Sequence, residues 1–417
     1  GSVLTEADDG VEDVNIQLNS SSNNYSSTTD PGGMYNFDGL ETGLDYTVTP
    51  LKDDGPLNGV STFDLVLISR HILGVQELDS PYKRIAADVN NSGAITTFDL
   101  VELRKLILFV STEFPNNTSW RFVDKDFVFP NPDNPWETEF PEIINVNNLS
   151  GAITDANFVA IKIGDVNGSA VANNNMNDDT EGRSSASLLF DVQDATFQPG
   201  ETVTLTMTAK DFDRISGFQF TLAFDQSSLA LASVEPTGVT SLENFGLALP
   251  ADGVITVSWH QAEPVSLEDG KAVIQLTFTA KTPGNLRETV HINSSFTTAE
   301  AYQGSLSVSP EVLNVSLNYT GNMPAPLAGH EPELYQNIPN PFSRQTTIGF
   351  NLPEACRASV TLFDTNGKVV LSMENEYPAG YNEVAIQRRD LPVTGILFYR
   401  LQTPTYQTTR KMTLVNQ

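Results

Sequence analysis

Two spacings of hydrophobic side chains alternate along this sequence, and they predict many strands and few helices. Polar and apolar residues alternate with a period of two, which is typical of half-buried strands, over much of the chain. The clearest such segments are 14–18, 202–207, 272–278, 346–352 and 359–364. Apolar residues at helical spacing occur in the runs 63–74, 98–108 and 157–164. We therefore predict a mainly β protein of multidomain β-sandwiches with one small α-helical module.

Two polar stretches divide the chain into units. Residues 171–185 and 320–333 hold few large apolar side chains, so we predict that both are linkers. The change from strand pattern to helical pattern near residue 51 marks a further boundary. The predicted units are β-sandwiches at 1–51, 186–319 and 334–417 and a helical module at 52–170.

Acidic residues dominate the charge, with 52 Asp and Glu against 23 Lys and Arg and a net charge of −29. This excludes electrostatic binding of nucleic acid as the default function and favours divalent cations. The single cysteine, Cys356, cannot form an intrachain disulfide. We expect no transmembrane segment, because no apolar run reaches the roughly 18 residues that span a bilayer. No signal peptide is visible either, so we expect a longer precursor.

One polar loop carries the ligand pattern of a calcium site. Residues 88–99 place side-chain oxygens at positions 1, 3 and 5, a glycine at position 6 and a carboxylate at position 12. Calcium requires this pattern because it takes six to eight hard oxygen ligands. The predicted Ca²⁺ ligands are Asp88, Asn90, Ser92, the carbonyl of Ala94, and Asp99. The alternative is an Asn- and Asp-rich turn that only caps a helix.

Two weaker copies flank this loop. Alignment on Asp64 places Asp53 at the first ligand position, so Asp53, Ser61 and Asp64 are candidate ligands of a degraded site. A third copy at 145–157 carries an inserted residue and is followed by the run 165–168. We interpret it as a vestigial repeat, with or without metal.

An aromatic loop separates the second and third helical runs. It spans 111–141 and holds Trp120, Phe122, Phe127, Phe129, Trp136 and Phe140. Such a loop either packs over the helices or forms a binding surface. We favour packing, because loose exposed aromatic side chains promote aggregation.

The first two units resemble modules of surface proteins. The order TEADDGVEDVNIQL, then GLDYTVTP, in residues 5–50 resembles the CnaB or SdrD-B-like prealbumin-type repeat, which implies a rigid spacer. The calcium loop, with an aspartate at position 12 and only one helix per loop, resembles dockerin.

The next unit is similar to a cohesin domain, through the run GETVTLTMTAKDFDRISGFQFTLAFDQSSLALASV at 200–234. The resemblance implies a nine-stranded jelly-roll sandwich. Dockerins and cohesins bind each other, helix face to sheet face, between different proteins of cellulosomes. Here a short linker joins the two modules, so we expect intramolecular packing of the dockerin-like helices on the cohesin-like sheet, with Val66, Leu67, Leu103 and Leu106 at the contact.

The last unit resembles the type A C-terminal sorting domain of Bacteroidetes type IX secretion cargo. Three blocks carry this resemblance, and their motif residues are Leu334, Tyr335, Pro339, Asn340, Pro341, Phe342, Gly395, Tyr399 and Lys411. It implies export through the periplasm to the outer-membrane surface or beyond. The implied partners are the shuttle and translocon of the type IX system, met through 334–417.

Signals for catalysis are poor, and we predict no enzymatic activity. The four histidines are scattered, and no nucleophile elbow or phosphate-binding glycine loop occurs. We expect the non-catalytic C-terminal region of a large secreted protein. The alternatives are an adhesin that binds glycan or protein, with Trp259 as the best exposed aromatic candidate, and a fragment of a secreted hydrolase with two facing carboxylates. The ligand of the parent protein and the cleavage site before the sorting domain stay open.

Overall fold

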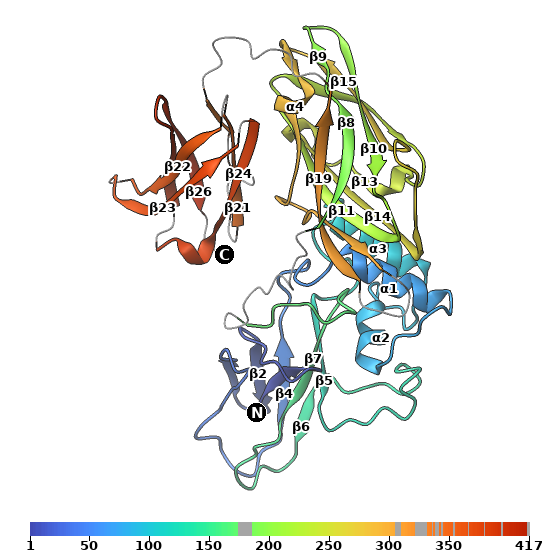
Figure 1. Ribbon diagram of the computed structural model, residues 1–417. Coiled ribbons are helices and arrows are strands. Elements are labelled where there is room, and N and C mark those ends of the chain that lie inside the picture. The colour runs from blue at the N-terminus through green and yellow to red at the C-terminus, as the bar shows by residue number, and fades with distance from the viewer. Residues whose placement is uncertain are drawn as a thin grey trace.

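The protein is mainly β, as predicted, with four helices among the described residues. The computed structural model describes residues 1–173, 186–304, 310–321, 332–335, 337, 342, 345–352, 355–365, 367–378, 380–392 and 395–414. Figure 1 shows the helices α1, α2 and α3 between the N-terminal sandwich and a larger β-sandwich above them.

The N-terminal sandwich draws strands from both sides of the predicted boundary at residue 51. Its sheets have the orders β1-β7-β5 and β3-β2-β4-β6. The strands are β1 (Val3–Thr5), β2 (Asn15–Ser20), β3 (Asn24–Thr28), β4 (Tyr46–Leu51), β5 (Trp120–Asp124), β6 (Ile144–Val146) and β7 (Phe158–Lys162). The helical module is therefore an insertion between β4 and β5. Val14, Ile16, Trp120, Phe122 and Phe158 lie in one core.

The prediction of a third helix at 157–164 is wrong. The segment forms β7, which lies between β1 and β5 with all five residues buried. A strand covered on both faces is apolar throughout, so its pattern cannot be told from that of a buried helix. The β-branched Val159 and Ile161 favour the strand.

The helices α1 (Thr62–Ile72), α2 (Pro81–Ala87) and α3 (Thr97–Ile107) form the inserted module. Ser61 and Asp64 make a capping box at the start of α1, and Thr96 and Asp99 make the same box at α3. The predicted packing of the aromatic loop over the helices is confirmed for Phe129 and Phe140, which are buried in one core with Leu65, Ile68, Leu103 and Leu106. Trp120 and Phe122 instead lie in β5 and belong to the core of the N-terminal sandwich. Helix α2 was not predicted; its N-cap Ser80 and Pro81 were the available signal.

The central β-sandwich contains the longest strand path of the molecule, in the order β12-β15-β10-β8-β19-β18-β11-β14-β13. Its elements are β8 (Ser187–Gln193), β9 (Thr196–Phe197), β10 (Thr202–Lys210), β11 (Ile215–Phe224), β12 (Leu229–Pro236), η1 (Leu242–Asn244), β13 (Phe245–Gly246), η2 (Pro250–Asp252), β14 (Val254–Val265), β15 (Ala272–Ala280), β16 (Gly284–Asn285), α4 (Leu286–Thr289), β17 (Val290–Asn293), β18 (Glu300–Gln303) and β19 (Glu311–Thr320). Its core is rich in phenylalanine and includes Trp259.

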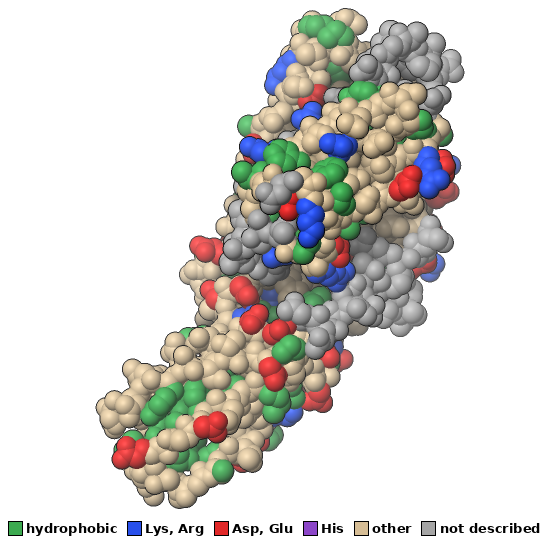
Figure 2. All heavy atoms as spheres, turned by 90° about the vertical axis from the view of Figure 1, so that its left-hand side faces the viewer, with side chains coloured by type: hydrophobic (Ala, Val, Ile, Leu, Met, Phe, Trp, Pro, Cys, Tyr) green, Lys and Arg blue, Asp and Glu red, His purple; other side chains and the backbone are tan. Residues whose placement is uncertain are grey.

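The C-terminal unit is a separate two-sheet sandwich with its own core. The sheets have the orders β20-β21-β24 and β23-β22-β25-β26. Its elements are β20 (Glu333–Leu334), β21 (Gln345–Leu352), β22 (Cys356–Phe363), β23 (Val369–Tyr377), β24 (Gly380–Gln387), η3 (Arg388–Asp390), β25 (Gly395–Gln402) and β26 (Gln407–Leu414). On the face shown in Figure 2, acidic and basic side chains are interspersed, and hydrophobic side chains gather at the lower end, over the N-terminal sandwich.

Candidate functional site

The five predicted ligands of the loop 88–99 lie around one turn between α2 and α3. The carboxylate of Asp88, at the C-cap of α2, accepts hydrogen bonds from the amides of Ser92 and Gly93, both at 2.8 Å. That of Asp99, in the first turn of α3, accepts from the amides of Asn90 at 3.1 Å and Thr96 at 2.8 Å. Gly93 has a φ of 79°, which glycine adopts without strain.

The donor set of this loop suits a calcium ion. The side-chain oxygen of Asn90 is buried and has no hydrogen-bond partner in the described structure, although buried polar atoms are normally paired. Asp88 and Asp99 are also fully buried. Burial raises the pKa of Asp99, and the charge of Asp88 raises it further. A divalent cation would neutralise both carboxylates and ligate the amide oxygen.

The predicted ligands of the degraded first site, Asp53, Ser61 and Asp64, do not all lie together. Ser61 and Asp64 meet at the start of α1, where the Asp64 carboxylate accepts from the Ser61 amide at 2.9 Å. Asp53 is held elsewhere, because its carboxylate accepts from the amide of Ser119 at 2.7 Å. Asp64 instead accepts from the amide of Val166 at 2.9 Å. Burial, and then the charge of Asp165, raises the pKa of Asp64.

The third copy pairs with the N-terminal sandwich. The hydroxyl of Thr47 donates to the Asn145 side chain at 2.8 Å, and the amide of Asn148 donates to Asp45 at 2.7 Å. Among the described residues, no group of three His, Cys, Asp or Glu side chains converges as a metal site. Calcium loops do not depend on such a group, since amide, hydroxyl and carbonyl oxygens complete their shells.

The helical module packs on the outer face of β11 and β14. All ten residues of β11 are buried, whereas an antiparallel strand commonly leaves one face in water. Its core side includes Phe218 and Phe220. Its other face and that of β14 carry the polar residues Gln219, Thr221, Thr256 and Ser258, each at most 3% exposed.

The start of α1 supplies partners for this polar face. The amide of Thr62 donates to the Gln219 side-chain oxygen at 2.7 Å, and the hydroxyls of Thr62 and Ser258 lie 2.6 Å apart. Two turns later Arg70 donates to the carbonyl of Ala262 at 2.9 Å. Thr62, Val66 and Arg70 are spaced by four residues and share one helix face, so the fully buried Val66 faces the sheet. Leu103 and Leu106 belong to the core of the helical module instead.

The end of α3 makes a second set of contacts. The hydroxyl of Thr256 donates to the carbonyl of Leu108 at 2.6 Å, and that of Thr297 donates to the carbonyl of Ile107 at 2.9 Å. Arg104 pairs with Glu243 at 3.1 Å. A Cβ atom on Gly246 would meet the Leu108 carbonyl oxygen at 2.2 Å, so the sheet requires glycine at this approach.

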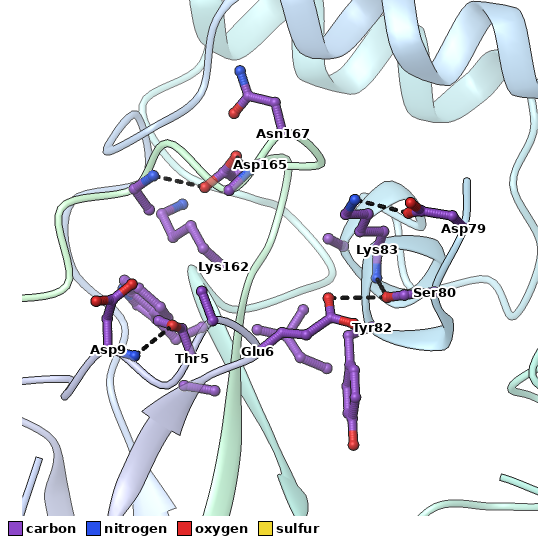
Figure 3. A pocket seen from close by; sticks show the side chains of 17 residues that line it. Thr5, Glu6, Asp9, Asp79, Ser80, Tyr82, Lys83, Lys162, Asp165 and Asn167 are labelled. Atoms are coloured by element: carbon purple, nitrogen blue, oxygen red, sulfur yellow. Dashed lines mark hydrogen bonds and ion pairs between the residues drawn. The ribbon is translucent and has the colours of Figure 1, made fainter. Parts of the chain in front are cut away.

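A cavity of about 450 Å³, lined by both charged and apolar side chains, lies between the N-terminal sandwich and α2. Figure 3 shows Lys162, Asp165 and Asn167 along one side of it, opposite Asp79, Lys83 and Ser80. The Lys162 ammonium donates to the carbonyls of Pro56 and Ile163 at 2.9 and 3.1 Å. Burial lowers the pKa of Lys162 to about 7, although nearby aspartates oppose this shift.

The residues of the three sorting blocks that the structure describes converge in the C-terminal sandwich. Tyr399 is fully buried; its hydroxyl donates to the carbonyl of Tyr335 and accepts from the amide of Asn337, both at 2.8 Å. Phe342 forms an isolated parallel β-bridge with Leu414, and Lys411 lies opposite Phe398 in the antiparallel pair of β25 and β26. Leu334 is buried and Gly395 begins β25 with a φ of 96°. Pro339, Asn340 and Pro341 lie outside the described residues.

Three segments of the chain match models of known protein families. The model of the cohesin domain matches 189–313, that of the type I dockerin domain 58–108, and that of the secretion-system C-terminal sorting domain 337–415. The sorting domain implies export by type IX secretion, to the cell surface or beyond. No described helix is long and apolar enough to cross a membrane. No curated protein matches the chain.

Solved structures of cohesins are similar to part of this chain. A cohesin of Acetivibrio cellulolyticus scaffoldin B, solved with a dockerin, is 18% identical, with 32% of this chain and 100% of that chain covered and a TM-score of 0.25. A type I cohesin from Pseudobacteroides cellulosolvens is 18% identical, with 35% and 99% covered and a TM-score of 0.25. The cohesin–dockerin family models and the sorting domain together define the class: a multimodular exported protein whose matched modules are of non-catalytic kinds.

Proposed function

We propose that this chain is a non-catalytic part of an exported cell-surface protein, in which the dockerin-like module is held on the chain's own cohesin-like sheet. The pair would then act as a rigid spacer braced by Ca²⁺, and not as a device that joins different proteins. The observation that carries this proposal is the buried polar face of β11 and β14, whose partners come from the start of α1 and the end of α3.

The covalent connection favours this pairing. The linker predicted at 171–185 holds about fifteen residues, and a random coil of that length spans roughly 20 Å on average. Such a tether gives the second module an effective concentration in the millimolar range. An external cohesin or dockerin would have to compete with this internal partner for the same surface.

The sequence features that suggested an adhesin or a hydrolase do not support these functions once their side chains are located. Trp259, the candidate for a glycan-stacking strip, is 1% exposed, and its indole donates to the carbonyl of Val239 at 2.9 Å. The outer face of β11 and β14, where an adhesin of this kind would grip a partner, is covered by α1 and α3. Three of the carboxylates that line the cavity beside α2 are engaged: Asp79 pairs with Lys83 at 2.7 Å, Asp165 accepts backbone amides, and Glu6 accepts from the Ser80 hydroxyl at 3.0 Å. These observations favour a structural role over hydrolysis.

A disulfide trap on the full chain tests the internal pairing. In a Cys356→Ala background, Thr62→Cys combined with Ser258→Cys places two thiols where hydroxyls now lie 2.6 Å apart. We expect oxidation to give a cross-linked product with the mass of one chain, independent of protein concentration.

Thr97→Cys with Ser258→Cys is the matched control. Thr97 occupies the same position in the second TFDLV repeat as Thr62 in the first, but it is exposed. The control pair should not cross-link within a chain. Cross-linked dimers, or equal trapping of both pairs, would overturn the proposal.

The sorting domain provides the second part of the proposed function. The described residues of its three motif blocks contribute to one core, among them Leu334, Phe342 and Tyr399, which supports a compact recognition unit for the shuttle and translocon of type IX secretion.

A further inference from the structure

A second loop with the design of 88–99 is assembled from two segments that lie far apart in the sequence. One segment, 165–171, follows strand β7, and the other, 58–64, leads into α1. Asp64 and Val166, which are 102 residues apart, are joined by a hydrogen bond of 2.9 Å. The sequence pattern D-x-N-x-S at 165–169 repeats that at 88–92.

Several hydrogen bonds of the two loops correspond, although the Asn167 side-chain oxygen, unlike that of Asn90, accepts from the amide of Ser169 at 3.0 Å. Asp165 accepts from the amides of Ser169 at 3.2 Å and Ala170 at 2.8 Å, as Asp88 accepts from the fourth and fifth residues after it. The Ser169 hydroxyl donates to the carbonyl of Gly59 at 2.9 Å. The equivalent bond in the continuous loop runs from Ser92 to the carbonyl of Ala94 at 3.1 Å.

The carboxylate that closes each loop is also held in the same way. Asp64 accepts from the amide of Asn167 at 3.3 Å and from that of Ser61 at 2.9 Å. Asp99 accepts from Asn90 and Thr96 at the corresponding positions. In both loops the first and last carboxylates are buried: Asp165 is 7% exposed and Asp64 is fully buried.

The two segments are in direct backbone contact at residues 58–59 and 170–171. The Asn58 side chain donates to the carbonyl of Val171 at 2.8 Å and accepts from its amide at 3.0 Å. Gly59 has a φ of 73°, and a Cβ atom there would lie 2.5 Å from the backbone of Ala170. The two segments therefore meet along a fixed register and do not merely lie near each other.

We propose that Asp165, Asn167, Ser169, the carbonyl of Gly59 and Asp64 form a second Ca²⁺ site, split between two chain segments. These are the oxygens at positions 1, 3, 5, 7 and 12 of a calcium loop. The dockerin model begins at residue 58 and therefore omits the first three of these side chains. The ion would tie the end of β7 in the N-terminal sandwich to the first turn of α1, which is the turn that contacts Gln219 and Ser258.

This inference rests on the proposed function only in taking calcium as the resident ion. Isothermal titration calorimetry of the calcium-stripped full chain counts the sites. We expect two ions per chain for the wild type, one for Asp165→Asn, one for Asp88→Asn and none for the double variant. Asp155→Asn, an exposed carboxylate in the same region, is the matched control and should keep two.

The outcomes separate the two proposals. Two sites of unchanged affinity in Asp165→Asn would overturn the split site. A wild-type protein with one site, which Asp88→Asn removes, would also overturn it, but this result would leave the proposal of calcium bracing intact. No binding at all would overturn both. If Asp165→Asn fails to fold, the exposed Asn167 gives a milder variant: Asn167→Ala should weaken one site at least tenfold, and two unchanged affinities would overturn the inference.

Discussion

The side-chain oxygen of Gln219 accepts a 2.7 Å hydrogen bond from the backbone amide of Thr62, the first residue of α1. The first amides of a helix have no partner within the helix. Here the cap Ser61 accepts from the Phe63 amide at 3.1 Å, and the sheet of another module satisfies the Thr62 amide. The start of α1 is thus completed by a residue of the central sandwich, which makes the helix and the sheet parts of one hydrogen-bonded structure.

Thr256→Val should weaken this interface. Valine keeps the β-branched shape but leaves the buried carbonyl of Leu108 without its donor, which costs about 1–3 kcal/mol. We expect a lower urea midpoint for the helical module and faster proteolysis between the modules. Thr279→Val changes an exposed threonine on β15 in the same way and should have no such effect. Equal midpoints for the two variants would count against the interface.

Asp99→Ala should remove one bound calcium ion and the capping box of α3 together. The loss of the cap costs about 0.5–2 kcal/mol with or without calcium. The loss of the ion costs about 2.7 kcal/mol more when calcium is present at a hundred times its dissociation constant. Thermal unfolding with calcium and with EDTA separates the two effects. A variant that binds the full complement of calcium with unchanged melting would exclude this loop as a site.

Lys162→Met should flatten the dependence of stability on pH above neutrality. The pKa of Lys162 is about 7 in the folded protein against a usual value of 10.5, so between these values the unfolded chain binds more protons than the folded one. Stability therefore falls as the pH is lowered from about 10 to about 7, by up to about 1.4 kcal/mol per unit. Urea unfolding at pH 7, 8, 9 and 10 measures the slope. Lys125→Met, at a more exposed lysine, should retain it.

Tyr399→Phe should destabilise the C-terminal sandwich. The variant loses a buried hydroxyl that bonds both Tyr335 and Asn337, and the loss of these two hydrogen bonds costs about 1–3 kcal/mol. Hydrogen exchange of β25 and β26 in the full chain should show reduced protection. Tyr406→Phe, at a half-buried tyrosine outside this network, is the control, and the idea fails if both variants exchange alike.

Deletion of 334–417 should abolish export in a type IX-competent host and leave the upstream modules folded. The reason is that the C-terminal sandwich has a hydrophobic core of its own, so the other units do not depend on it for burial. Fractionation of cells locates the truncated protein, and circular dichroism of the purified chain checks its fold. Normal arrival at the cell surface would contradict the sorting role.

Local signals were sufficient for several parts of the fold. Thr62 to Gly74 and Thr97 to Leu108 carry helical spacing and N-terminal caps, and both form helices. The dipeptide Asn366-Gly367 is a strong local signal for a tight hairpin turn, and β22 pairs with β23 on either side of Gly367, whose φ is 80°. Each of these features is determined by residues within one or two turns of each other.

Other parts depend on contacts between distant residues. The run Phe158 to Lys162 has no local property that distinguishes a buried strand from a buried helix, and its pairing with β1 and β5 decides the matter. The alternation along β11 separates Gln219 from Phe218, but by itself it does not reveal that the polar face of this strand is buried as well.

The continuous loop at 88–99 is predictable from the sequence alone, because its candidate ligands lie within twelve residues and their spacing can be counted. The sequence alone does not show that Asp64 lies beside the loop of Asp165 and that Asp53 lies elsewhere. This arrangement depends on how the strands on either side of the inserted helices pair in the N-terminal sandwich. The pairing of β7 with β1 and β5 places Asp165, which follows β7, beside the start of α1. Burial of apolar side chains in the cores that these elements share therefore brings together the candidate ligands of the split loop, whose distance along the sequence hides their relationship.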